Sequence, residues 1–276
     1  MKVLDKKTLA LPNEEVSEGE RTGINTSGII SRCGEHTIAL FITGLRHAGE
    51  NLKEVLSRRK AELFPPLQMS DALPANRPGD EPTVRGFCLA HGRRKFADIA
   101  KHFPDECLYV LERIGEVYKF ERETEAMTKE ERLSHHQTHS QKVMQELKDY
   151  MQRSLDNHLV EPNSSLGEAF RYMLKHWEEL TLFLRAAGAP LDNNLCERAL
   201  KKAILHRKNA LFYKTANGAM VGDLYMSLIH TCELNDLNPF DYLVTLLRHS
   251  KKVRDTPEHW LPWNYQTTLQ GLTQPT

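Results

Sequence analysis

Residues 22–44 read TGINTSGIISRCGEHTIALFITG, and this stretch is the strongest indication of the fold. Two runs, 22–31 and 36–44, are rich in β-branched residues, and a short turn that contains Gly34 separates them. β-Branched side chains favour strands, and two such runs joined by a short glycine-bearing turn are typical of a hairpin. The sequence therefore predicts an antiparallel β-hairpin near the start of the chain.

The residues that follow alternate between helical and short apolar patterns. Apolar positions at helical spacing predict a helix over 47–63, ended by Pro65 and Pro66. The runs LQMSD (67–71) and GFCLAH (86–91) predict two short strands. Helical periodicity then continues over 92–188 and returns at 191–205, where Asp192 is placed as the N-cap, at 217–235 and at 239–252. These patterns predict an α/β fold in which a small mixed sheet is interrupted by a large all-helical insertion, with a helical C-terminus.

These changes of pattern divide the chain into five expected segments. They are a disordered or remnant tail (1–20), core strands with the first helix (21–91), the helical insertion (92–188), a catalytic-helix region with the C-terminal helices of the core (189–250), and a C-terminal tail (251–276).

Composition limits the class of protein. The 276 residues include 37 Lys and Arg against 37 Asp and Glu, so the net charge of zero argues against a protein coated in positive charge. No apolar run approaches the ~18 residues of a membrane span, and the first twenty residues lack the apolar core of a secretory signal. We therefore expect a cytoplasmic protein without a membrane partner.

The cysteines and histidines do not form an evident metal site in the sequence. The five cysteines are scattered without a CxxC pair, which is typical of buried thiols. Three histidines lie close together, at 135, 136 and 139, but no cysteine or carboxylate ligand pattern accompanies them. We interpret this stretch as the solvated face of a polar helix.

Two acidic residues are candidates for metal chemistry. Asp71 ends a predicted strand, where α/β sheets present side chains to a crevice, and Glu197 lies on the helix that follows Asp192. Two carboxylates brought together could hold Mg²⁺, which prefers oxygen ligands. The alternative is that Asp71 is a turn residue and Glu197 a solvated helix charge, and spacing alone favours this plainer interpretation.

Cations cluster beside both candidate acids, which suits a polyanionic substrate. One group follows the GFCLAH run and comprises His91, Arg93, Arg94 and Lys95. A second surrounds Glu197 and includes Arg198, Arg207 and Lys208. In RKNALFYKT (207–215) the cations alternate with aromatic residues, so nucleic-acid contact and ordinary helix surface are equally good interpretations there.

Four strings resemble the insertion sequence 66 transposase family. They are AHGRRKF (90–96), LDNNLCERALKKAILHRKNALF (191–212), NGAMVGDLYMSLIHTCELNDLNPFDYL (217–243) and LPWNY (261–265), and the similarity extends from about Thr22 to Tyr265. The resemblance implies a DDE transposase with a ribonuclease-H-like core, which cuts DNA at element ends and joins it to a target. By motif, Asp71 matches the second aspartate and Glu197 the glutamate that bind Mg²⁺ or Mn²⁺.

The resemblance also implies DNA as the partner, with Arg94, Lys95 and Arg198 near its phosphates. It further implies a homo-oligomer in the DNA complex, with possible helper proteins of the same element. The family's first aspartate lies in a strand before the hairpin, whereas this chain begins with MKVLDKKTL, and Asp5 lacks the family context. We therefore expect a truncated transposase with impaired activity; the alternative is an inactive DNA-binding or multimerising remnant.

Overall fold

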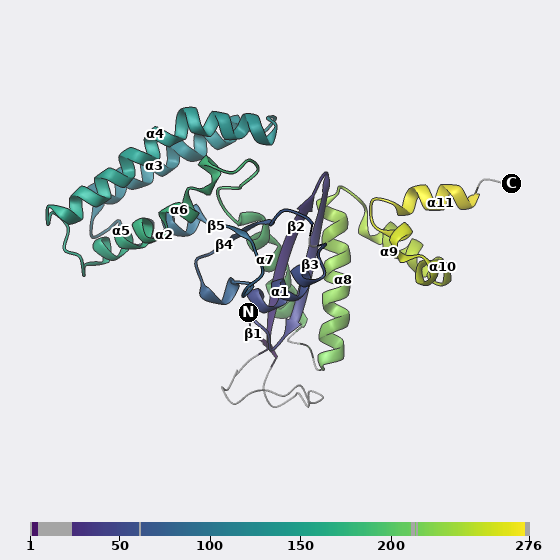
Figure 1. Ribbon diagram of the computed structural model, residues 1–276. Coiled ribbons are helices and arrows are strands. Elements are labelled where there is room, and N and C mark those ends of the chain that lie inside the picture. The colour runs from purple at the N-terminus through teal and green to yellow at the C-terminus, as the bar shows by residue number, and fades with distance from the viewer. Residues whose placement is uncertain (1, 5–23, 61, 211–212, 214, 274–276) are drawn as a thin grey trace. The chain divides into compact units, whose positions relative to one another are not determined.

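The computed structural model describes residues 2–4, 24–60, 62–210, 213 and 215–273 of the chain. The chain forms two compact units. The first comprises Met1–Ser57, Arg77–Gly79 and Asn194–Thr276, and the second comprises Arg58–Asn76 and Asp80–Asn193. Both units combine helices with a small sheet, and Figure 1 labels their elements.

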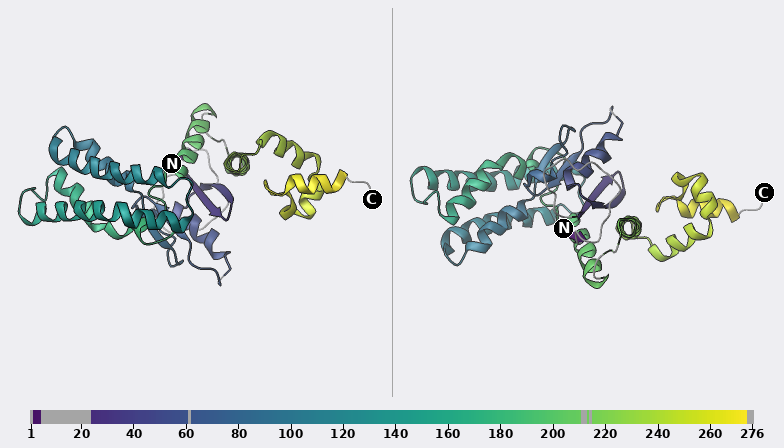
Figure 2. Two further views of the ribbon diagram at one scale, coloured as in Figure 1. Left: turned by 90° about the horizontal axis from the view of Figure 1, so that it is seen from above. Right: turned by 90° about the horizontal axis from the view of Figure 1, so that it is seen from below.

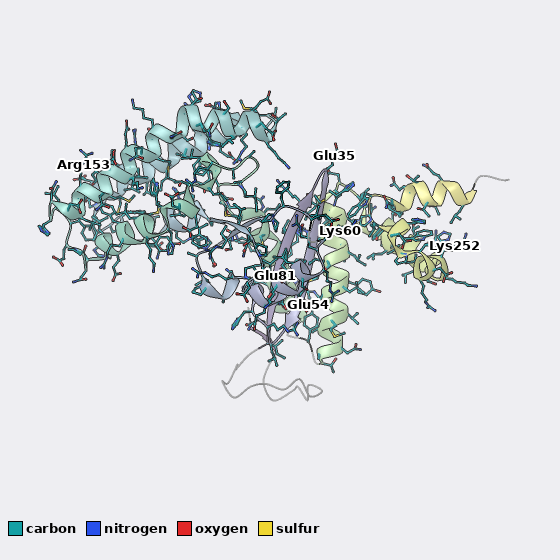
Figure 3. All side chains as sticks on the ribbon, viewed as in Figure 1. Glu35, Glu54, Lys60, Glu81, Arg153 and Lys252 are labelled. Atoms are coloured by element: carbon teal, nitrogen blue, oxygen red, sulfur yellow. The ribbon has the colours of Figure 1, made fainter. Side chains whose placement is uncertain are left out.

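The first unit is built on the predicted hairpin. Strand β2 (Ile24–Cys33) pairs antiparallel with β3 (His36–Gly44), and β1 (Lys2–Leu4) pairs antiparallel with β2 on its other side. Cys33 lies opposite His36, so only two residues make the turn, and Gly34 adopts the positive φ of 60° that such a tight turn requires. Glu35, beside Gly34, marks the tip of the hairpin in Figure 3. The prediction of a hairpin is confirmed.

Helix α1 (Ala48–Ser57) follows the hairpin and is shorter than the sequence predicts. The expected helix over 47–63 included Leu63 on its apolar face, but Leu63 lies outside the helix and half of its surface is exposed. The helix therefore ends well before Pro65, and the prediction that the prolines end it is wrong.

Helix α7 (Asn194–Ala210) packs on β2, and its apolar positions Ala199 and Ala203 are buried against Ala39 and Phe41 of β3. The sequence placed Asp192 as the N-cap of this helix, but the helix begins two residues later. The Asp192 carboxylate instead accepts a hydrogen bond of 3.1 Å from the hydroxyl of Tyr118, within the second unit.

Helix α8 (Ala216–Leu234) lies along β3, the outermost strand of the described three-stranded sheet. Polar side chains four residues apart on α8 and in the turn after it accept hydrogen bonds from the backbone N–H groups of every second β3 residue. The pairs are Asp223 with Thr43 (2.5 Å), Ser227 with Phe41 (2.9 Å), Thr231 with Ala39 (3.1 Å) and Asn235 with Thr37 (3.2 Å). Four helical residues rise about 6 Å and two strand residues about 6.8 Å, so the two periods match over this length. We call this set of contacts the edge ladder, since it occupies N–H groups that an edge strand would otherwise expose.

The C-terminal part of the first unit is helical. It contains α9 (Pro239–Arg248), α10 (Ser250–Asp255), a 3₁₀ turn (Pro257–Trp260) and α11 (Tyr265–Thr273). Trp260 and Tyr265 are buried with Tyr242 of α9, whose hydroxyl donates to the Trp260 carbonyl at 2.8 Å. We expected a tail from residue 251, and the structure has packed helices there because these aromatic side chains anchor them.

The second unit begins with two short parallel strands, β4 (Leu67–Ser70) and β5 (Val84–Phe87). A 3₁₀ turn, Pro74–Asn76, lies between them. The strand expected over 86–91 is wrong in its second half. The strand ends at Phe87, and helix α2 (Leu89–Ile99) starts after Cys88 because Leu89, Gly92 and Phe96 form its buried face at helical spacing.

The helical insertion is confirmed in its secondary structure. It continues with α3 (Pro104–Glu123), α4 (Lys129–Asp156), α5 (Ser165–Lys175), α6 (Trp177–Leu180) and a 3₁₀ turn, Leu182–Leu184. The views in Figures 1 and 2 show α3 and α4 side by side along their length. Thr128 and Glu131 form a reciprocal capping box at the start of α4. The core of this unit is a large apolar cluster that includes Phe96, Leu147 and Phe170.

One interpretation from the sequence is wrong inside this unit. His136 is not solvated but wholly buried, with Nε2 2.7 Å from Glu121 Oε2 and Nδ1 2.8 Å from the Ser140 hydroxyl. Arg132 binds the same Glu121 carboxylate through two nitrogens, at 2.9 and 3.0 Å, and donates to the Ala189 carbonyl at 2.7 Å. Every member has partners, as buried polar groups require. We call Glu121, Arg132, His136 and Ser140 the buried network.

Other expectations concern single residue types. All five cysteines are free thiols, and Cys88, Cys107 and Cys232 are buried as expected, whereas Cys33 is exposed. Within the described residues, no helix combines the length and the apolar character that crossing a membrane requires. The chain is thus mixed α/β and mostly helical, with two small sheets; a ribonuclease-H-like core stays a prediction.

Candidate metal and nucleic-acid site

Asp71 directly follows β4, at the carboxyl end of the parallel strand pair. The neighbouring strand ends level with it, because the Cys88 N–H donates to the Ser70 carbonyl at 2.9 Å. Asp71 Oδ1 accepts hydrogen bonds from the Leu73 N–H, at 3.2 Å, and from the Asn76 side-chain amide. Ligands commonly bind at this edge of α/β sheets. The carboxylate is therefore held in a defined orientation at a position suited to a ligand.

Tyr172 of α5 links Asp71 to one of the predicted cations. Burial raises the pKa of the Tyr172 hydroxyl, and the negative charge of Asp71 raises it further. The ammonium group of Lys95 lies 4.3 Å from the centroid of the same ring. A cation over an aromatic face is stabilised by the ring, which also restrains its position. Asp71 and Lys95 therefore lie around one aromatic side chain within the second unit.

The first group of predicted cations lies on α2 and not after a strand. The apolar side of the helix packs into the unit, so Arg93, Arg94 and Lys95 are exposed, while His91 is partly buried. Exposed guanidinium and ammonium groups can reach phosphate oxygens at little cost in lost contacts. Cys88, just before the helix, has its thiol pKa raised, chiefly by burial. A buried thiol with a raised pKa is a poor nucleophile.

Glu197 is positioned by the close approach of α7 to β2. The Cys196 thiol lies 3.3 Å from the Gly28 carbonyl oxygen as a donor, and a Cβ at Gly28 would come within 2.8 Å of the Leu200 side chain. Glycine at 28 thus permits the helix to lie directly on the strand. Cys196 and Leu200 face the sheet, and Glu197 lies in the first turn of the helix, partly exposed.

The cations near Glu197 have different surroundings. Arg198 and Lys208 are exposed. Lys202, also exposed, forms an ion pair with Glu233 of α8, which gives it a structural role. The side chain of Arg207, and residues 211, 212 and 214 of the cation–aromatic stretch, lie outside the described residues.

The structure thus brings together part of the predicted set. Asp71, His91, Arg93, Arg94 and Lys95 belong to the second unit, and Glu197, Arg198, Arg207 and Lys208 to the first. The pairing of Asp71 with Glu197 in one metal site stays a prediction. Sequence reasoning missed Tyr172, because it lies in a helical pattern in which nothing distinguishes a ring beside a charged site from a core aromatic.

Comparison with known proteins agrees with the motifs. The transposase IS66 family matches residues 32–221, a span that contains both Asp71 and Glu197. Two uncharacterized proteins of Sinorhizobium fredii, y4jD and y4hP, are 34% and 31% identical over 195 and 202 residues, covering 69% and 67% of this chain. A third from the same organism, y4qI, is 29% identical over 189 residues.

The chain spans little more than a third of the length of these curated relatives: 38% of y4jD, 36% of y4hP and 34% of y4qI. No solved structure matches it significantly. The family match covers well over half of the chain and includes the strands and helices that carry the candidate acids and cations. The chain therefore belongs to the transposase IS66 family.

Proposed function

We propose that this chain provides part of the catalytic domain of a DDE-type transposase, for metal-dependent DNA cleavage and strand transfer in the transposition of an insertion sequence. The observation that carries the proposal is the place of Asp71, directly after a strand of a parallel pair, in a chain whose family match also spans Glu197. The proposal includes a ribonuclease-H-like core, a cytoplasmic location, a homo-oligomer on DNA, and helper proteins of the same element.

In this proposal Asp71 and Glu197 hold Mg²⁺ or Mn²⁺. Carboxylate oxygens are the ligands these ions prefer, and ligating carboxylates are commonly oriented by further hydrogen bonds, as Asn76 and the Leu73 N–H orient Asp71. Bound metal would supply activation of the attacking water or hydroxyl and stabilisation of the leaving oxygen. Because we assign no residue of this chain to the family's first aspartate, we propose that the chain alone has low activity.

The cations have the complementary role of binding DNA phosphates. Arg93, Arg94 and Lys95 are exposed on α2 close to Asp71, and Arg198 and Lys208 are exposed on the helix that carries Glu197. Phosphate contacts of this kind fix the position of DNA without reading its sequence, and each makes binding more sensitive to salt.

The test combines strand transfer with metal binding. Strand transfer on end-containing DNA with Mg²⁺ or Mn²⁺ should fall at least about a hundredfold in Asp71→Asn and Glu197→Gln, the scale of losing an electrostatic group from an active site. Mn²⁺ binding, followed by electron paramagnetic resonance, should weaken in both variants. The control is Asp98→Asn, an exposed acid on α2. Activity or Mn²⁺ binding that survives Asp71→Asn as well as it survives Asp98→Asn would refute the assignment of Asp71.

A second candidate function is an inactive DNA-binding or multimerising module. It is favoured by the bonds from Leu73 and Asn76 to Asp71 Oδ1, which an ordinary turn also makes. This module would retain DNA after Glu197→Ala and lose it, with strong salt dependence, when Arg93, Arg94 and Lys208 are replaced.

A further inference from the structure

Three side chains that the proposed function does not use lie together on the helical pair α3–α4. They are Glu123, the last residue of α3, and His135 and His139, one helical turn apart on α4. We propose that these three residues form a binding site for Zn²⁺ or a similar divalent transition metal.

The distances between the three side chains suit a metal. His135 Nε2 lies 3.2 Å from Glu123 Oε2, and the His135 and His139 rings have centroids 4.4 Å apart with 43° between their planes. Two ligands that each lie 2.0–2.1 Å from a tetrahedral zinc ion are about 3.3 Å from one another. The His135–Glu123 pair therefore already has the separation of two zinc ligands, and rotation of the His139 ring about its side-chain bonds completes a set of three.

The residue types point to zinc rather than to Mg²⁺. Imidazole suits zinc, copper and nickel, whereas Mg²⁺ takes oxygen ligands. Two histidines at i and i+4 share one face of a helix, and two histidines with one carboxylate are an established zinc ligand set that leaves a position for water. The site therefore differs in chemistry and in residues from the acid site of the proposed function, and does not rest on it.

The surroundings hold these side chains in place. His136, between the two proposed ligands in sequence, points inward into the buried network, which ties α4 to α3 through Glu121. The Phe120 ring lies 6.2 Å from the His135 ring and 5.3 Å from the His139 ring, so it restricts the positions of both. A rigid support of this kind preserves ligand geometry.

Access and charge also favour a bound cation. The Glu123 side chain is 44% exposed, His139 is exposed, and His135 retains 15% exposure, so an ion can enter from solvent. Glu123 lies at the C-terminal end of α3, where the helix dipole adds negative potential to that of the carboxylate. A divalent cation there would offset both.

The experiment is a calorimetric titration of the full chain with ZnCl₂, together with the visible absorption of the Co²⁺ form, which reports nitrogen and oxygen ligands. We expect His135→Ala/His139→Ala to lose one equivalent of bound Zn²⁺ and the matching Co²⁺ band. Glu123→Gln should weaken that equivalent at least about tenfold, since even the loss of an outer-shell partner typically costs 10–100-fold.

The control variant is His102→Ala, which removes an exposed histidine beyond the end of α2. It should bind Zn²⁺ like the unaltered chain. Circular dichroism of each variant checks that the helices are intact. The proposal is wrong if the double variant binds as many equivalents with the same affinity, or if His102→Ala loses the same equivalent.

Discussion

The edge ladder between α8 and β3 can be tested by replacing Thr231 with valine. Thr231 is 5% exposed, and its hydroxyl accepts from the Ala39 N–H at 3.1 Å and lies 3.3 Å from the Ala39 carbonyl as a donor. Valine has nearly the same shape and no hydroxyl, so Thr231→Val removes these contacts and leaves the packing almost unchanged.

The magnitude follows from what the substitution leaves behind. Ala39 is fully buried, so water cannot replace the lost partner of its N–H group. A buried backbone group without a partner costs about 1–3 kcal/mol. We therefore expect the free energy of unfolding of the first unit to fall by about 2 kcal/mol, which corresponds to roughly a thirtyfold change in the unfolding equilibrium.

Two measurements follow this change. Urea unfolding monitored by the fluorescence of Trp260 and Trp263, both in the first unit, gives the shift in stability. Native-state hydrogen exchange shows whether the Ala39 amide loses protection. The matched control is Thr245→Val on α9, whose hydroxyl bonds only to the Asp241 carbonyl of its own helix. The reasoning fails if Thr231→Val is no more destabilising than Thr245→Val and the Ala39 amide keeps its protection.

The same ladder makes stability depend on pH through Asp223. Burial raises the pKa of this carboxyl, and its two hydrogen bonds to Thr43 lower it only in part. The folded state therefore keeps a proton that the unfolded chain releases near pH 4. Stability should fall as the pH rises from about 4 through the raised pKa and stay level above it. In Asp223→Asn this decline should vanish from the pH profile of urea unfolding.

Two further variants test the buried network and the contact of α7 with β2. Burial would raise the pKa of Glu121, but the hydrogen bonds from His136 and Arg132 lower it, so its contribution is present above about pH 4.3 and is lost as the pH falls through the lowered pKa. Glu121→Gln should flatten this acid limb in thermal unfolding; an unchanged limb would contradict the assignment. Gly28→Ala should destabilise the chain by about 1–3 kcal/mol, because the added methyl group would lie 2.8 Å from the Leu200 side chain. Leu200→Ala should restore part of this loss in the double variant, and purely additive effects would show that the two residues do not clash.

The sequence by itself was sufficient for the local elements. Alternation of β-branched residues around Gly34 predicted the hairpin, and helical periodicity predicted the long insertion, since both patterns depend on the spacing of neighbouring residues. The motifs around Arg94 and Glu197 were sufficient for the family. Boundaries were less certain: GFCLAH changes from strand to helix at Cys88, because a short apolar run suits either form.

Only the tertiary structure decided which polar side chains are buried and which partners they meet. The stretch around His135, His136 and His139 has the composition of a solvated helix, yet one histidine points into the core while the other two meet Glu123 at the surface. Asp223, Ser227, Thr231 and Asn235 recur every four residues, but no local rule says that their partner is a strand edge about 190 residues earlier. Periodicity records which face of a helix is shared, and the identity of the partner depends on contacts between distant segments that only the folded chain brings together.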